Sequence, residues 1–402
     1  MRNIGIVKTN SYYYWYISIV IFFSLWIVYY RLPYISIFYI PAIIIIFLRS
    51  KYDIILRKDE LVFIFIFIVY QSLPSSYQSI ERNIGNVVNA VFIIALFFLR
   101  KEEIECIFIK VKYILVVILF FGFIFYTINL FGDIIKPFDV FVNEVNRLYV
   151  IYPFYVVEYP NFSYFDITEV WRFRSVFDEP GYLGTLAFFL LYIDSFDFSK
   201  KYNFLIFLCG LFTFSMAYYI LCMIYYMLYS KEKIALILFS VMIILIFGYI
   251  YYNVNPEIMN RFISRFEISN TYEFAGDSRG GFMSTIDIYN SVISQDAISV
   301  LFGNGKLSYN HLQNGVDIRI SDPTWVRIIY EYGLLYFILF ITFLVRFSAV
   351  NINGLLFGIL FAISLYQRPE VFYPIWFLLL IYSRIKYLKG ISKKSWLFAE
   401  LS

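Results

Sequence analysis

Long apolar runs recur along the whole chain, and short charged segments separate them. Runs of about 18 or more apolar residues are typical of helices that span a membrane. Of 402 residues, 61% are hydrophobic and only 15% are charged, and the mean hydropathy is +0.71. A soluble domain of this length would not carry so much apolar surface. The sequence therefore predicts an all-α polytopic membrane protein in which residues 1–402 form a single integral membrane domain.

We expect 11 or 12 transmembrane helices, because the runs within 203–229 are compatible with two short spans or with one broken helix. The first run follows Arg2 and Lys8 and lacks a small-residue cleavage site, so we expect it to be retained. The predicted spans are 12–30, 33–48, 61–77, 84–99, 113–131, 182–196, 203–214, 216–229, 234–252, 324–346, 352–366 and 371–384.

Two segments between spans, 132–181 and 253–323, are too long and too polar to be ordinary turns. With alternating spans, both lie on the side opposite the termini, and loops of such length are usually functional. Lysines predominate on the side of the termini, so the positive-inside rule places both termini in the cytoplasm. The basic residues on the outer side are Lys136, Lys306, Arg31, Arg82, Arg147, Arg172, Arg174, Arg261, Arg265, Arg279, Arg319, Arg327 and Arg368.

The first large outward loop ends in the sequence Arg172-Phe-Arg174-Ser-Val-Phe-Asp178-Glu179-Pro180-Gly. Pro180 suits the first turn of a helix, with Asp178 or Glu179 in a capping position. The two arginines would share a face if the stretch is extended, and a helix N-terminus beside them also attracts anions. Snorkelling to lipid headgroups is the alternative for these arginines. The acidic pair and the proline favour a phosphate site.

The second large outward loop holds a similar concentration of arginines. Arg261 and Arg265 would share a face on a helix, and Arg279 precedes an amphipathic stretch. Residues 301–305, Leu-Phe-Gly-Asn-Gly, predict a glycine turn. They do not match a nucleotide-binding fingerprint, because that motif requires a preceding strand and none is predicted here.

The chain returns to the membrane through Asp322-Pro323. Arg327 then lies about one turn inside a span, where a charge needs a partner or a polar cavity. A structural pair between Arg327 and Glu331 is the alternative to a substrate role. Arg368, between the last two spans, adds a further outward arginine.

Metal and cofactor chemistry has no support in the sequence. The lone histidine, His311, is more typical of a solvated loop residue, and no cluster of histidine, cysteine and carboxylate has metal-ligand spacing. The three cysteines, Cys106, Cys209 and Cys222, lie in apolar stretches, which predicts buried packing.

An enzyme outside the cytoplasm lacks ATP, so it needs a preactivated substrate such as a lipid pyrophosphate. Arginine is preferred for the bidentate recognition of phosphate.

Taken together, these motifs and Glu331-Tyr-Gly333 resemble the O-antigen and capsular polysaccharide polymerases of the Wzy type. The resemblance covers most of the chain in layout, through short motifs. It implies a metal-independent membrane glycosyltransferase with a GT-C-like fold in the bacterial plasma membrane, with its active site facing outward. The related O-antigen ligases typically carry a histidine-asparagine pair about ten residues before Glu-X-Gly. Here that stretch reads Ser321-Asp322-Pro323, which favours polymerase over ligase.

The resemblance implies that undecaprenyl-pyrophosphate-linked oligosaccharides are joined into surface polysaccharide. Its further partners would be membrane lipids and a chain-length regulator, whereas the small net charge argues against nucleic acid. Expected catalytic residues are Arg174, Glu179, Arg279, Asp322 and Arg327, and Arg172, Arg261, Arg265 and Arg368 are expected to bind substrate. Either Asp322 or Glu179 would be the general base. The alternative from another class is a flippase, which should show internal repeats and charges near mid-span.

Overall fold

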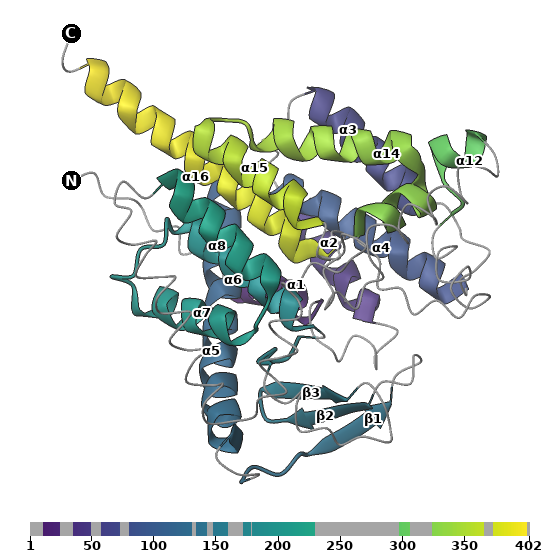
Figure 1. Ribbon diagram of the computed structural model, residues 1–402. Helices are drawn as coiled ribbons and strands as arrows, with labels where there is room; N and C mark the ends of the chain where they lie inside the picture. The colour runs from purple at the N-terminus through teal and green to yellow at the C-terminus, as the bar shows by residue number, and fades with distance from the viewer. Residues whose placement is uncertain are drawn as a thin grey trace, which may run out of the picture.

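The structure is a computed structural model that describes residues 11–24, 35–49, 58–72, 80–130, 134–142, 148–159, 172–177, 179–229, 297–305, 324–365 and 373–399. Most of these residues are helical (Figure 1). The helices are α1 (Ser11–Phe23), the 3-10 helix η2 (Ile35–Phe38), α2 (Tyr39–Arg49), α3 (Lys58–Ser72), α4 (Ile80–Phe97), α5 (Lys101–Leu130), α6 (Pro180–Ile193), α7 (Lys201–Phe212), α8 (Met216–Tyr229), α12 (Ala297–Phe302), α14 (Thr324–Ser348), α15 (Ile352–Ser364) and α16 (Pro374–Ala399).

Two helices in the described ranges are long and apolar enough to cross a membrane, namely Lys101–Asn129 within α5 and Ile328–Ser348 within α14. The other apolar helices found there are 10–17 residues long. Each of them overlaps one of the expected spans. The expected span 234–252 lies outside the described residues. A membrane location therefore agrees with the helices by length and composition.

Residues 203–229 form two helices, α7 and α8, which a turn at residues 213–215 separates, in agreement with the two short spans expected there. One other expected span needs correction in detail. Helix α5 begins at Lys101 and not near residue 113. The residues before 113 include charged side chains, which lie outside the apolar run, but they are helical as well because these side chains have partners. The carboxylate of Glu103, for example, accepts a hydrogen bond of 2.5 Å from the Tyr13 hydroxyl on α1.

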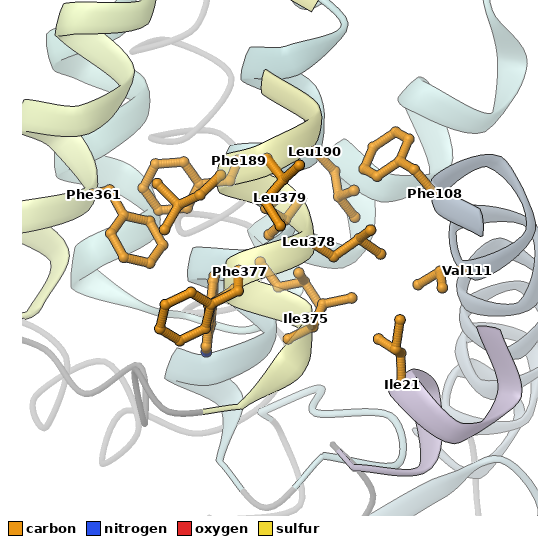
Figure 2. Packing of buried hydrophobic residues seen from close by; sticks show 14 of the residues in the cluster. Ile21, Phe108, Val111, Phe189, Leu190, Phe361, Ile375, Phe377, Leu378 and Leu379 are labelled. Atoms are coloured by element: carbon orange, nitrogen blue, oxygen red, sulfur yellow. The ribbon is translucent and has the colours of Figure 1, made fainter. Parts of the chain in front are cut away.

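The core lies around α6 and the first half of α16. Every side chain from Tyr182 to Ile193 is buried, as is every one from Ile375 to Ile381. A helix that is apolar and buried on all sides is typical of the centre of a large bundle. Figure 2 shows α16 residues packed between Phe189 of α6 and Phe361 of α15 on one side and Phe108 of α5 on the other. Helices α1, α4, α5, α14 and α15 contact α16, and α7 and α8 contact α6.

A three-stranded antiparallel sheet occupies part of the first large loop, and it departs from the all-α expectation. Its strands are β1 (Asp139–Val142), β2 (Leu148–Tyr152) and β3 (Tyr155–Tyr159), in the order β1-β2-β3. They lie beside the end of α5 in Figure 1. On β2, Val150 joins the main core, whereas Tyr149 and Ile151 form a second small cluster with Val156. This alternation follows from the two faces of a strand.

The cysteine prediction holds for two of the three residues. Cys209 and Cys222 are buried, but Cys106 is exposed on α5, and none of the three forms a disulfide. The prediction was wrong for Cys106 because residues 101–112 of α5 lie before the continuous apolar run.

Candidate functional site

Residues 172–177, which end the first large loop, are held by backbone hydrogen bonds on two sides. The amide of Phe173 donates to the carbonyl of Phe212 at the end of α7, at 2.8 Å. The carbonyl of Ser175 accepts from the amide of Val156 on β3, at 2.9 Å. The segment thus joins the edge strand β3 to the end of α7.

Arg174 lies within this segment and is buried, with 4% of its surface exposed. Its neighbour Ser175 adopts φ 52°, and the Ser175 hydroxyl donates to the carbonyl of Phe154 at 3.1 Å. Positive φ is uncommon outside glycine, and it persists where the surroundings fix the backbone. A guanidinium remains charged at every relevant pH, so a buried one requires polar or anionic neighbours. The fold therefore holds one permanent positive charge in a fixed place.

Arg172 occupies a different environment from Arg174. It is half-buried, and its Nε donates to the carbonyl of Thr213 at 3.3 Å. Thr213 lies in the turn between α7 and α8, where its hydroxyl donates to Gly210 at 2.6 Å. Arg172 therefore extends toward this turn, and the two arginines do not form one uniform face.

The start of α6 agrees with the sequence prediction. Pro180 lies in the first turn, and Glu179 is the N-cap residue with extended backbone angles. The Glu179 carboxylate makes no capping hydrogen bond to the backbone of α6. Asp178 lies outside the described residues. The N-terminus of α6, with its partial positive charge, thus follows Arg174 by a few residues.

Close packing fixes α6 against the turn that Arg172 contacts. A Cβ added at Gly184 would lie 2.8 Å from the Cβ of Ser215 and 3.0 Å from the hydroxyl of Thr213. Only hydrogen at this position lets the helix approach the turn so closely. The loop end, the α7–α8 turn and the start of α6 therefore pack into one unit, here called the arginine segment (residues 172–177, 179–184 and 213–215).

A second unit joins the glycine turn to α14. Gly303 and Gly333 have φ of 82° and 89°, and Gly333 interrupts α14. The carbonyls of Tyr330 and Glu331, released by this interruption, accept from the amides of Asn304 at 2.9 Å and Gly305 at 3.0 Å. The predicted glycine turn is thus confirmed, and two motifs thirty residues apart in sequence share one backbone interface, here called the glycine contact (residues 301–305 and 330–333).

Other expected site residues lie outside the described residues: Arg261, Arg265, Arg279, Asp322 and Arg368. Arg327 belongs to the first part of α14, but the structure describes only its backbone. Glu331, one turn later, is buried, with 3% of its surface exposed. The structure thus brings Arg172, Arg174 and Glu179 into one unit, and their positions relative to the remaining arginines stay a prediction.

Buried charges elsewhere were missed by the sequence analysis. Lys112 of α5 binds Asp194, the C-cap residue of α6. The Lys112 ammonium also lies 3.4 Å from the amide oxygen of Asn203 on α7. Arg384 of α16 binds Glu60 of α3 at 2.6 Å. The sequence does contain a sign of these pairs: each has a charged residue inside or beside an apolar run, and a charge in the membrane requires a partner. These pairs join helices that are distant in sequence.

No protein-family model, no curated protein and no solved structure matches this chain. Within the described ranges, no group of three or more histidine, cysteine, aspartate or glutamate side chains is placed to hold a metal ion. The candidate site therefore rests on its own geometry: a buried arginine, a second, half-buried arginine and a glutamate at the N-terminus of a helix.

Proposed function

We propose that the chain is a membrane glycosyltransferase that polymerises undecaprenyl-pyrophosphate-linked oligosaccharide repeat units on the outer face of the bacterial plasma membrane. One observation carries the proposal: Arg174 is buried and fixed immediately before the proline-initiated helix α6. A helix N-terminus and an arginine together favour a phosphate group. The outward excess of arginine over lysine supports the same ligand.

The packing of charged helix ends supports the proposed topology of alternating spans with cytoplasmic termini. Lys112 of α5 contacts Asp194 of α6, and Lys386 of α16 donates to the carbonyl of Ile193. Lys112, Asp194 and Lys386 lie within two residues of the ends that the charge pattern assigns to the cytoplasm in the expected spans 113–131, 182–196 and 371–384. The arginine segment contacts the second half of α5, the start of α6 and the end of α7: a Cβ added at Gly122 of α5 would lie 3.2 Å from the hydroxyl of Ser175, and the amide of Phe173 donates to Phe212.

In the proposed reaction, a hydroxyl of one lipid-linked unit attacks the sugar carbon that carries the pyrophosphate of the growing chain. The new glycosidic bond forms as the carbon–oxygen bond to pyrophosphate breaks. Arg174, with Arg279 and Arg327, would neutralise the departing charge, which is the largest change in charge during the reaction. Arg172, Arg261, Arg265 and Arg368 would hold the lipid pyrophosphates. Glu179 or Asp322 would accept the proton of the attacking hydroxyl.

Replacing Arg174 by lysine tests the proposal. Lysine keeps the charge but loses the planar, bidentate donor geometry, so we expect loss of long polymer while single lipid-linked repeats still reach the outer surface. Gel analysis of polysaccharide length in a strain lacking the native gene measures this result. Arg100→Lys, the same change between α4 and α5, is the matched control and should leave polymer length unchanged.

Three outcomes separate the proposed function from its alternatives. Single repeats displayed without long polymer support a polymerase. Loss of all outward display would instead indicate a flippase, and full-length polymer left unattached would indicate a ligase. Normal polymer from Arg174→Lys protein, at equal protein levels, would contradict the role of Arg174.

A further inference from the structure

The turn between β2 and β3 lies directly against the second half of α5. Pro153 and Phe154 form this turn, since Tyr152 pairs with Tyr155 in the sheet. A Cβ added at Gly122 of α5 would lie 2.5 Å from the carbonyl oxygen of Phe154, so this close approach requires glycine on the helix. Phe154 adopts φ 63°, a conformation that persists where the surroundings fix the backbone. The turn is therefore held at one place along α5.

The ring of Phe154 belongs to an apolar surface that begins on α5. Its centroid lies 5.5 Å from that of Phe121 and 6.1 Å from that of Phe125. Phe120 lies beside Phe121, with ring centroids 5.4 Å apart. Phe120, Phe121 and Phe154 are 47%, 41% and 42% exposed, respectively. The turn thus extends an exposed face of α5, here called the phenylalanine surface (Phe120, Phe121, Phe125 and Phe154).

The phenylalanine surface lies within the part of α5 that can cross a membrane. Residues Lys101–Asn129 are long and apolar enough to do so. A helix rises about 1.5 Å per residue, so Phe125 and Phe121 lie about 6 Å and about 12 Å before the end of this segment. The hydrocarbon core of a bilayer is about 30 Å thick. Side chains exposed at these positions of a spanning helix therefore face acyl chains.

The backbone of the turn suits such a position. A polar backbone group within hydrocarbon needs a hydrogen-bond partner. Pro153 has no amide hydrogen, and the carbonyl of Phe154 accepts from the Ser175 hydroxyl at 3.1 Å. The amide of Val156 donates to the carbonyl of Ser175 at 2.9 Å. The proline and the arginine segment thus reduce the number of polar groups that the turn brings into the membrane.

We propose that the β2–β3 turn inserts Phe154 into the membrane, where the acyl chains of the phospholipids cover it. In the proposed topology this is the outer leaflet. Continuity with the exposed face of a membrane-length helix identifies the partner. Because Ser175 bonds to the turn and follows Arg174 directly, the insertion also holds the arginine segment at a fixed depth. The proposal rests on the membrane location and is independent of polymerase activity.

Spin labels on single cysteines test the proposal in the full-length protein, reconstituted in phosphatidylcholine vesicles. Cys106→Ser removes the exposed native cysteine, and Cys209 and Cys222 are buried. For a label at Phe154→Cys, we expect more frequent collisions with oxygen than with a water-soluble nickel chelate, because oxygen concentrates among acyl chains. Val140→Cys on β1, at a residue that is 51% exposed, should show the opposite order.

Phe120→Cys on α5 is the reference for a position that faces lipid. The same preference for oxygen at residues 120 and 154 supports the proposal. A preference for oxygen at residue 120, with a preference for nickel at residue 154, would overturn it, because only the helix would then lie in lipid. A preference for nickel at both positions would overturn it as well, together with the membrane location of α5.

A second variant keeps the test decisive if Phe154→Cys protein does not fold. Phe154→Trp retains an aromatic ring, and its added fluorescence over the native protein should be quenched by phosphatidylcholine that carries bromine on its acyl chains. The added fluorescence of Val140→Trp should not be quenched. Equal quenching of the two variants, or none at residue 154, would overturn the insertion. Neither measurement depends on polymer formation, so a negative result would leave the proposed enzymatic function in place.

Discussion

Single glycines decide the backbone path at the glycine contact. Gly333 adopts φ 89° and ψ 161°, a region that essentially only glycine occupies. A Cβ at this position would also lie 2.2 Å from the carbonyl oxygen of Leu301. The sequence predicted a turn at residues 301–305, but nothing in it indicated that the turn would pack on residue 333. Contacts between distant segments depend on the whole fold.

Gly333→Ala should therefore lower the free energy of unfolding by about 2–4 kcal/mol, since backbone strain and the clash add together. Gly305→Ala is the matched control: its φ is 93°, but an added Cβ would meet nothing within 4 Å. We expect about 1 kcal/mol there. Thermal unfolding in detergent compares the two, and equal losses would contradict the importance of the close contact.

The buried pair of Glu60 and Arg384 offers another prediction for individual residues. Their side chains are 2% and 5% exposed, so Glu60→Gln leaves a buried charge without its partner and should cost about 3–5 kcal/mol. Lys389→Gln breaks the exposed pair with Glu105, whose lysine is 54% exposed, and should cost about 0–1 kcal/mol. Unfolding measurements on both variants check the difference.

Individual elements were predictable to different degrees. The helices followed from apolar runs, and α8 coincides with its predicted limits. The sheet was missed because the loop was interpreted as polar. Residues 148–152 and 155–159 are nevertheless rich in valine, isoleucine and tyrosine around Pro153, a pattern typical of a hairpin. The paths of α5 and α14 depended on ion pairs and on a glycine interruption, which hydropathy does not reveal.

Helix α15 depends on a cap that also reaches α16. The Asn351 side chain accepts from the amide of Gly354 at 2.8 Å and donates to the carbonyl of Tyr387 at 3.1 Å. Asn351→Ala should therefore cost about 1–2 kcal/mol of unfolding free energy. Asn351→Ser keeps a capping oxygen and should recover part of the loss. Equal stability of the alanine variant and the native protein would contradict this role of the cap.

For the whole molecule, charge distribution predicted the proposed topology, whereas the three-dimensional relation between the two large loops could not be predicted. Arg172, Arg174 and Glu179 are close in sequence, so their association was predictable. Their placement against the α7–α8 turn was not, because the contacts with Phe212 and Thr213 arise only after the helices have packed.

The exposed Cys106 allows a direct test of this topology. A membrane-impermeant maleimide should label it in inside-out vesicles and not in intact cells, whereas buried Cys209 and Cys222 stay unlabelled in the folded protein. In a Cys106→Ser background, Val140→Cys on β1 should show the opposite pattern, because Val140 is 51% exposed. Labelling of both positions from the same side would contradict the proposed orientation.

The glycine contact also has an evolutionary consequence. The backbones of residues 301–303 and 331–333 are in direct contact there. A side chain at residue 303 or 333 would therefore fit only if the facing backbone moved away. When homologous sequences are aligned, residues 303 and 333 should be retained or lost as a couple. Chimeras that exchange the second large loop between relatives should function only if residues 330–333 of α14 are exchanged together with the loop.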